Sequence, residues 1–198
     1  LQVVGEGGAA SSIRAAHAFG SLPVISSSSQ PSIEDCAAAA PCDKWYQLYI
    51  RGDWEWVKTM VGRIRTASYR ALVLTVDAPV YSVRDRQLHH RWLPPSKKAV
   101  HDDDFQALMD WDFVARVREF AEIPVVLKGI QCAADAELAV KHGAGAIWIS
   151  NHGGRHLDHA RPTLEVLREI APVVAGRAPI VVDGGFMRGS DFIKIGRA

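Results

Sequence analysis

Short apolar runs alternate along the chain with segments whose apolar residues recur at helical spacing. The short runs predict six β-strands, at 22–26, 45–50, 71–76, 124–128, 146–150 and 180–183. The helical spacing predicts helices at 9–19, 32–39, 54–67, 113–122, 133–142 and 163–174. Strands that alternate with helices are typical of βα units around a parallel sheet that is buried on both faces.

One stretch, at about 94–110, interrupts this alternation. It contains two adjacent prolines, two adjacent lysines and three consecutive aspartates, and no strand pattern survives in it. We predict a surface loop there, either a mobile lid or a plain solvated connection. The chain has 198 residues, of which 48% are hydrophobic. That is enough apolar mass for a single domain over 1–198.

Composition removes several classes of function. The 23 Lys and Arg residues nearly balance the 22 Asp and Glu residues, which argues against the broad positive field that non-specific nucleic-acid binding uses. No apolar run approaches the roughly 20 residues of a membrane-spanning helix, and the chain begins without a basic leader segment. We therefore expect no nucleic-acid partner, no membrane and a cytoplasmic location.

The cysteines and the adjacent histidines do not suggest a metal site. The three cysteines lack the spacing of metal ligands, which indicates incidental thiols in a reducing compartment. His89 and His90 are neighbours that cannot point to one ion along a strand, so we expect them in a solvated loop. His156 and His159 are expected to lie on the surface or to support a neighbouring residue, and not to bind a metal ion.

Polar side chains follow almost every predicted strand. Three strands end in pairs spaced by two residues, and a period of two directs both members of a pair to the same face. These pairs are Ser26 and Ser28, Gln47 and Tyr49, and Thr75 and Asp77. Lys128 ends the fourth strand, and Asp183 follows the sixth. Because the carboxyl ends of barrel strands meet at one mouth, the sequence predicts that these groups form one site.

The densest signal is Ser-Asn-His-Gly-Gly-Arg at 150–155. The His152 imidazole can exchange a proton near neutral pH. Arg155 carries a planar guanidinium that fits a carboxylate, and Arg84 offers a second one, so the two could hold one small carboxylic acid. Asp77, if it lies beside His152, would stabilise the imidazolium and orient the ring.

This motif stands in an ordered set that resembles the FMN-dependent α-hydroxy acid oxidase/dehydrogenase family, which includes glycolate oxidase, lactate oxidase and mandelate dehydrogenase. The other members of the set are the motifs at 46–49, 74–77, 125–129, 182–185 and 195–198. The resemblance implies a TIM (β/α)8 barrel that is incomplete in this chain, with the first strand and parts of the last units missing. At 194–195 the chain also joins segments that about ten residues separate in the family.

The resemblance assigns roles to the residues around the substrate. His152 is the base that takes a proton from the substrate, either from Cα or from the hydroxyl with hydride transfer to flavin N5, and both routes stay open. Arg84 and Arg155 bind the substrate carboxylate, Tyr49 forms a hydrogen bond with the substrate, and Asp77 is the partner of His152.

The resemblance also implies that FMN is the cofactor. Lys128 lies near flavin N1, where a fixed positive charge stabilises the reduced ring. Ser26, Gln47 and Thr75 match positions at the polar edge of the isoalloxazine, and Asp183 matches a ribityl contact. The phosphate end is matched by Gly184, Gly185, Gly196 and Arg197, with Arg188 as the nearest cation because Met187 stands where many members have arginine.

The expected function is the FMN-dependent oxidation of an (S)-2-hydroxy acid to the 2-oxo acid, with electrons passed to O2 or another acceptor. Ser28 stands where members similar to glycolate oxidase have a bulky aromatic residue, which favours an aromatic, mandelate-like or long-chain substrate. By resemblance, the assembly is a homotetramer. The alternative is a non-catalytic or degenerate barrel fragment that acts as a binding or oligomerisation module. Other FMN-binding or phosphate-binding barrel enzymes lack the pairing of His152 with Arg155.

Overall fold

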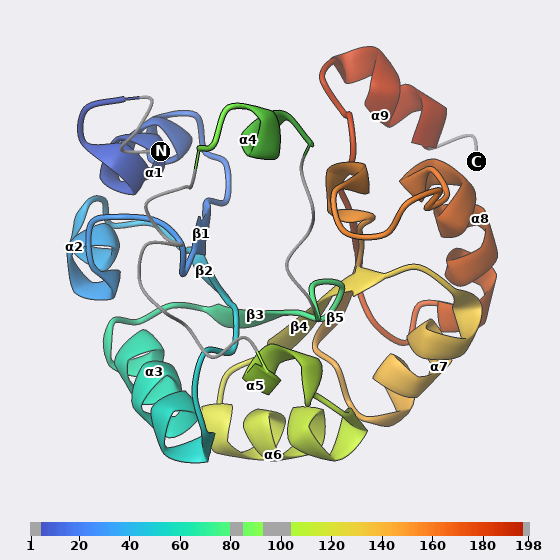
Figure 1. Ribbon diagram of the computed structural model, residues 1–198, viewed down its shortest axis with the longest axis horizontal. Coiled ribbons are helices and arrows are strands. Elements are labelled where there is room, and N and C mark those ends of the chain that lie inside the picture. Colours follow the sequence, from blue (N-terminus) through green and yellow to red (C-terminus); the bar gives the residue numbers. More distant parts are fainter. Residues whose placement is uncertain (1–4, 80–84, 93–103, 196–198) are drawn as a thin grey trace.

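The computed structural model describes residues 5–79, 85–92 and 104–195, and its centre is a curved parallel sheet with helices on the outer face (Figure 1). The strands pair in sequence order, β1 to β6. Their bounds are β1 Val24–Ser26, β2 Trp45–Leu48, β3 Ala71–Thr75, β4 Val125–Ile130, β5 Ala146–Ile149 and β6 Ile180–Val182. All six predicted strands are confirmed, and their ends move by two residues or fewer.

The six predicted helices are confirmed as well. They are α1 Gly8–Ala18, α2 Ile33–Ala38, α3 Trp54–Thr66, α6 Trp111–Ala121, α7 Ala133–Lys141 and α8 Thr163–Val174. Side-chain caps at three of them explain where they start, because the first amides of a helix have no partner inside it. Ser32, Asp53 and Asp110 accept hydrogen bonds from the backbone N–H groups of the first turns of α2, α3 and α6.

Four short elements were not predicted. They are α4 Asp85–His89, α5 Asp104–Ala107, the 3-10 turn η2 His152–Gly154 and α9 Gly189–Ile195. Each spans two turns or less, so a helical period is hardly visible in its sequence. The expected solvated loop is wrong for His89, which ends α4, and confirmed for His90, which lies in the turn after this helix; both side chains are exposed.

The predicted surface loop at about 94–110 differs from the structure in its second part. Residues 94–103 lie outside the described part of the chain. From Asp104 onward the backbone forms α5, and Gln106 in this helix is buried, with 7% of its surface exposed. The charged stretch therefore ends in a short helix, α5, whose Gln106 side chain is buried.

The sheet is buried on both faces. On β3, Leu72 and Leu74 point outward into the main core, and Ala71 and Val73 point to the inner face. The outer side chains pack against apolar residues of the surrounding helices, among them Val57, Val61, Ile64, Val166 and Ile170. This explains why the strands read as continuous apolar runs rather than as an alternation.

The order and curvature of the strands define the fold class. Six consecutive βα units curl around a common axis, with the helices on the convex side (Figure 1). This is the arrangement of a TIM (β/α)8 barrel, in which eight such units close the ring. The expected fold class is therefore confirmed. Among the described helices, none has both the length and the apolar character needed to cross a membrane.

Leu74 and Leu108 give a matched test of this packing. Leu74 is fully buried on the central strand β3, and Leu108 is 72% exposed. Leu74→Ala should lower the free energy of unfolding by about 2 to 5 kcal/mol because it leaves a cavity, and Leu108→Ala should change it by about 0.5 kcal/mol or less. Urea unfolding of both variants measures the difference; equal effects would contradict the assigned core.

Candidate active site

His152 lies at the carboxyl end of the sheet, between residues that follow β2 and β3. Its Nδ1 is 2.8 Å from Asp77 Oδ1, and its Nε2 is 3.4 Å from the Tyr49 hydroxyl. The His152 and Asp77 side chains are 7% and 3% exposed. The structure thus brings together three of the predicted catalytic residues from distant parts of the chain.

The hydrogen bond to Asp77 determines the tautomer of His152. An ionised carboxylate can only accept, so Nδ1 carries the proton and donates it to Asp77 Oδ1. In the neutral imidazole, Nε2 then keeps its lone pair on the side of Tyr49. The second carboxylate oxygen of Asp77, Oδ2, is buried and has no hydrogen-bond partner among the described residues. The arrangement is that of an oriented base with a negative charge behind it.

The backbone around His152 is unusual. His152 has φ 54°, and Gly153 and Gly154 follow with φ 67° and 66°. These values lie in the left-handed region, which residues other than glycine adopt only at a cost in conformational energy. Two side chains hold this turn: Asn151 Oδ1 accepts from Gly153 N–H, and Ser150 Oγ accepts from His152 N–H. The two glycines of the motif therefore allow the turn that directs the imidazole inward.

Gly129 provides the space for Asp77. The pairing of β4 with β5 shifts register between Lys128 and Ile130, and Gly129 at this irregularity has φ 113°. A Cβ atom at Gly129 would lie 2.5 Å from Cβ and Cγ of Asp77. Only glycine lets the carboxylate stay where it meets His152.

Lys128 belongs to a second polar group in the site. Its Nζ donates to Ser150 Oγ at 2.8 Å and lies 3.5 Å from Asp183 Oδ2. The Ser150 hydroxyl donates in turn to Asp183 Oδ2 at 3.0 Å. Ser150 therefore links the ammonium group, the carboxylate and the backbone of His152.

Gln47 and Thr75 form a buried polar pair on the inner face of the sheet. Gln47 Nε2 donates to the Thr75 hydroxyl at 2.8 Å, which leaves an acceptor on Gln47 and a donor on Thr75. At the end of β1, Ser26 Oγ accepts from Ser28 N–H, and Ser28 Oγ accepts from Arg51 Nη2 at 2.8 Å. All four predicted polar residues thus lie at the carboxyl ends of β1 to β3.

The structure describes two of the predicted binding arginines, Arg155 and Arg188. Arg155 is exposed, and its Nε donates to the His152 carbonyl oxygen at 2.8 Å. No other Arg155 hydrogen bond occurs within the described residues, so the two Nη groups can bind a carboxylate. Arg188 is exposed, and its backbone N–H donates to Asp191 at the start of α9. Arg84, Gly196 and Arg197 lie outside the described part of the chain.

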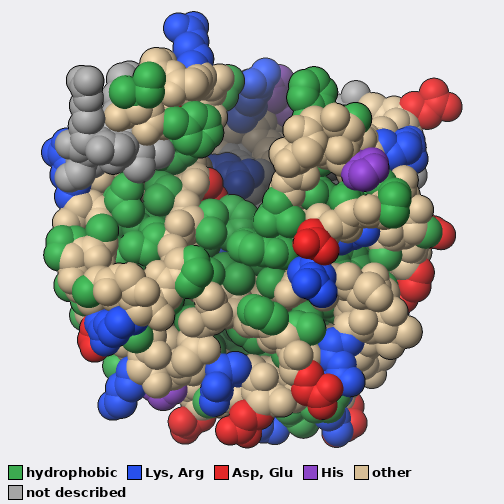
Figure 2. All heavy atoms as spheres, turned by 180° about the vertical axis from the view of Figure 1, so that it is seen from behind, with side chains coloured by type: hydrophobic (Ala, Val, Ile, Leu, Met, Phe, Trp, Pro, Cys, Tyr) green, Lys and Arg blue, Asp and Glu red, His purple; other side chains and the backbone are tan. Residues whose placement is uncertain are grey.

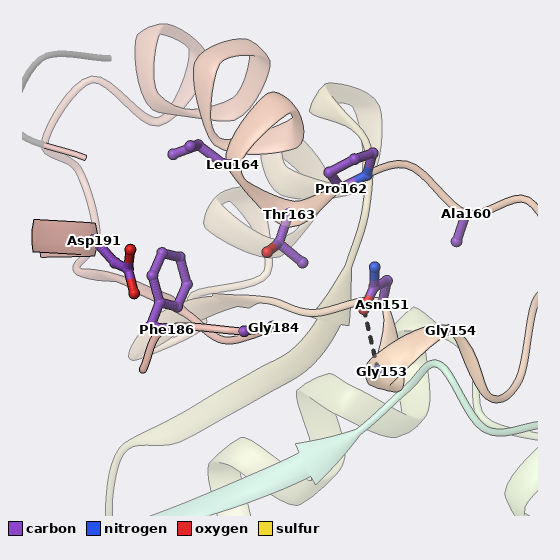
Figure 3. A pocket seen from close by; sticks show the side chains of 11 residues that line it. Asn151, Gly153, Gly154, Ala160, Pro162, Thr163, Leu164, Gly184, Phe186 and Asp191 are labelled. Carbon is purple, nitrogen blue, oxygen red and sulfur yellow. Dashed lines mark hydrogen bonds between the residues drawn. The ribbon is translucent and has the colours of Figure 1, made fainter. Parts of the chain in front are cut away.

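Gly184 and Gly185, which follow Asp183, line a cavity of about 570 Å³, and Gly184 is labelled in it in Figure 3. The two glycines have φ 102° and 91°. A Cβ atom at Gly184 would lie 2.9 Å from Thr163 Oγ1, which donates to the Asp183 carbonyl oxygen, whereas a Cβ at Gly185 would meet nothing within 4 Å. Bare backbone thus faces open space at the predicted phosphate end.

These residues fit FMN. Gln47 and Thr75 offer an acceptor and a donor, as the polar edge of the flavin ring requires. Lys128 supplies a cation beside them, and the backbone at Gly185 is open to a phosphate. Seen from behind the view of Figure 1, the molecule has a hollow with Lys or Arg side chains inside it and a His side chain at its edge (Figure 2). Among the described residues, no group of three His, Cys, Asp or Glu side chains could hold a metal ion.

Several supporting residues were not among the predicted site residues. Ser150 and Gly129 stand inside motifs that the sequence singled out, but only the fold shows what they contact. The His156 ring meets the His152 ring edge to face, with 4.1 Å between centroids, which agrees with its predicted supporting place. The sequence did not indicate a role for Gln106, because this residue lies in a stretch that was predicted to be a surface loop.

Known proteins resemble this chain over nearly its whole length. A sequence model of the FMN-dependent dehydrogenase family matches residues 2–196. The 2-hydroxyacid oxidase 2 of Rattus norvegicus is 36% identical over 94% of this chain and 58% of its own length. The L-lactate oxidase of Nostoc sp. is 37% identical over 96% of this chain and 59% of its own length. The chain thus spans somewhat more than half of these relatives.

Solved structures give the same result. A lactate oxidase of Pediococcus acidilactici superposes with a TM-score of 0.87 at 32% identity, over 94% of this chain and 54% of that one. A mandelate oxidase superposes with a TM-score of 0.84 at 39% identity, over 94% and 55%. The chain belongs to the FMN-dependent dehydrogenase family. The expected family and its cofactor, FMN, are confirmed.

Substitution of Gly129 tests how closely the backbone fits Asp77. Gly129→Ala should lower the free energy of unfolding by about 1 to 3 kcal/mol, because it combines a strained φ with a clash against a buried carboxylate. Gly62 in α3 is the matched control, because a Cβ there meets nothing within 4 Å; Gly62→Ala should raise stability by up to about 1 kcal/mol. Urea unfolding that ranks the two variants the other way would contradict the assigned role.

Proposed function

We propose that this protein oxidises an (S)-2-hydroxy acid to the corresponding 2-oxo acid with FMN as its cofactor. The observation that carries the proposal is the buried contact of 2.8 Å between His152 Nδ1 and Asp77 Oδ1. It leaves Nε2 as a base directed toward Tyr49, at the same strand ends as the polar residues that fit a flavin.

The proton is taken by His152 Nε2. Asp77 lies behind the ring, so its negative charge stabilises the imidazolium that forms. Arg155, through its two Nη groups, and Arg84 hold the substrate carboxylate, because a guanidinium matches that group with two parallel hydrogen bonds. Tyr49 donates a hydrogen bond to the substrate beside the base. Together these groups orient Cα and its hydroxyl relative to Nε2.

FMN, when bound, accepts the two electrons that leave the substrate. Gln47, Thr75 and Ser26 would hold its polar edge, and Asp183, Gly184, Gly185, Arg188, Gly196 and Arg197 its ribityl and phosphate end. Lys128 would supply a positive charge near the ring; its Nζ lies 2.8 Å from the Ser150 hydroxyl and 3.5 Å from Asp183 Oδ2. That charge favours electron transfer to the ring.

The substrate that we propose has an aromatic or long side chain, as mandelate does. The small Ser28 side chain supports this choice, because it leaves room where related enzymes carry a bulky aromatic residue. A relative named mandelate oxidase, 39% identical, is consistent with it. We propose O2 as the electron acceptor because the relatives are named oxidases. A homotetramer and a cytoplasmic location stay predictions from the sequence and its resemblance.

His152→Gln tests the base. In the absence of O2, a 2-hydroxy acid should bleach the visible absorbance of the FMN-loaded protein, and His152→Gln should slow the bleaching by about 10² to 10⁴-fold while FMN stays bound. His17 is the matched control, because it is exposed on α1; His17→Gln should bleach at the original rate. Stopped-flow absorbance with mandelate, lactate and glycolate measures these rates.

Two outcomes would overturn the proposal. Rapid bleaching of His152→Gln would show that another group takes the proton. A well-folded protein that holds no FMN would favour the alternative function, a binding or oligomerisation module.

A further inference from the structure

Gln106 connects the two strand ends that flank His152. It lies in α5, far along the chain from β2 and β3, and it is 7% exposed. Its Oε1 accepts from Ile50 N–H at 2.7 Å, and its Nε2 donates to the Thr75 carbonyl oxygen at 2.7 Å. One buried amide therefore bonds to the backbone after β2 and at the end of β3.

These two hydrogen bonds take the place of a missing rung of the sheet. The register of β2 with β3 ends at Leu48 and Leu74. In a parallel ladder that continued by one residue, Ile50 N–H would donate directly to the Thr75 carbonyl oxygen. The Gln106 amide is inserted between these two groups and satisfies both. It holds the strand ends apart at a defined separation.

The inserted amide lies next to the two partners of the imidazole. Tyr49 immediately precedes Ile50, and Asp77 is two residues after Thr75. The His152 ring stands between them, with Nε2 3.4 Å from the Tyr49 hydroxyl and Nδ1 2.8 Å from Asp77 Oδ1. The separation of β2 from β3 therefore governs whether both contacts exist together.

Few other contacts in the described residues bind these strand ends. The Tyr49 backbone N–H donates to Ser27 Oγ on the β1 side, and Val76 N–H donates to the Lys128 carbonyl oxygen on the β4 side. Each of these ties one strand to its outer neighbour. Across the gap between β2 and β3, Gln47 Nε2 also donates to the Thr75 hydroxyl. Among the described residues, Gln106 is the only side chain that bonds to both the Ile50 N–H and the Thr75 carbonyl oxygen.

We propose that Gln106 is a positioning residue for the reaction, because its amide sets the gap in which His152 contacts both Tyr49 and Asp77. The inference rests on the proposed function of His152 as the base. It reaches further, because it makes the geometry of the base depend on a residue that touches neither substrate nor cofactor.

Two substitutions separate the parts of this role. Gln106→Met keeps the length and removes both hydrogen bonds. Gln106→Glu keeps the acceptor for Ile50 N–H but sets a carboxylate oxygen against the Thr75 carbonyl oxygen, so it disturbs the Asp77 side alone. Gln131→Met and Gln131→Glu are the matched controls, because the half-buried Gln131 side chain makes no hydrogen bond within the described residues.

The first measurement is the proton NMR spectrum of the protein as purified, which needs no turnover. The His152 Nδ1 proton donates to a buried carboxylate, so its resonance lies far downfield. Both Gln106 variants should lose or broaden this resonance, and both Gln131 variants should keep it. The second measurement is anaerobic bleaching by a 2-hydroxy acid: both Gln106 variants should lower the limiting rate at least tenfold.

The outcomes distinguish the inference from the proposed function. A Gln106→Met protein that unfolds at lower urea but keeps the downfield resonance and the rate would show a merely structural role and overturn the inference. If Gln106→Met does not fold, Gln106→Glu decides by the same two measurements. If the resonance is lost in the Gln106 variants but no 2-hydroxy acid bleaches the original protein, the positioning stands and the proposed function falls.

Discussion

The hydrogen bond between His152 and Asp77 is the interaction on which the rest of the site depends. Asp77 is 3% exposed, and its other oxygen has no partner among the described residues. A buried carboxylate without a partner is strongly destabilising, so the imidazole stabilises the carboxylate as much as the carboxylate orients the imidazole. Each group explains the burial of the other.

The surrounding backbone accommodates this pair at several points. Gly129 has no side chain, which leaves room for Asp77, and the Ser150 hydroxyl accepts a hydrogen bond from the backbone N–H of His152, which has a left-handed conformation. Gln106 occupies the place of a ladder hydrogen bond between β2 and β3. A regular sheet would need none of these departures. They gather at the carboxyl ends of the strands, where a barrel places its chemistry.

Stability and function use different parts of the same strands. The outward side chains of β3 and β5, such as Leu72, Leu74 and Ile147, are fully buried against the helices. The polar groups lie in the last residues of the strands or just beyond them. Because the core is complete without them, side chains at the mouth can change with substrate while the sheet stays the same. Ser28, beside Arg51, is such a position.

The amino-acid sequence by itself determined the six strands, six of the helices and the residue types at the strand ends. Apolar period and capping residues are local properties, so a single sequence displays them. It also determined the family, because ordered motifs survive in it. Short elements escaped: α4 and α5 are too brief to show a period, and a stretch rich in charge was read as a loop.

The resemblance implied that Asp77 is the partner of His152, but only the tertiary structure shows the contacts by which the polar residues meet. Asp77 and His152 are 75 positions apart, and no local pattern records that the gap between β2 and β3 fits an imidazole. Nor could a sequence show that Gly129 clears space for a carboxylate or that a glutamine replaces a rung of the ladder. Such roles arise from contacts between distant segments, and those contacts exist only when the chain is folded.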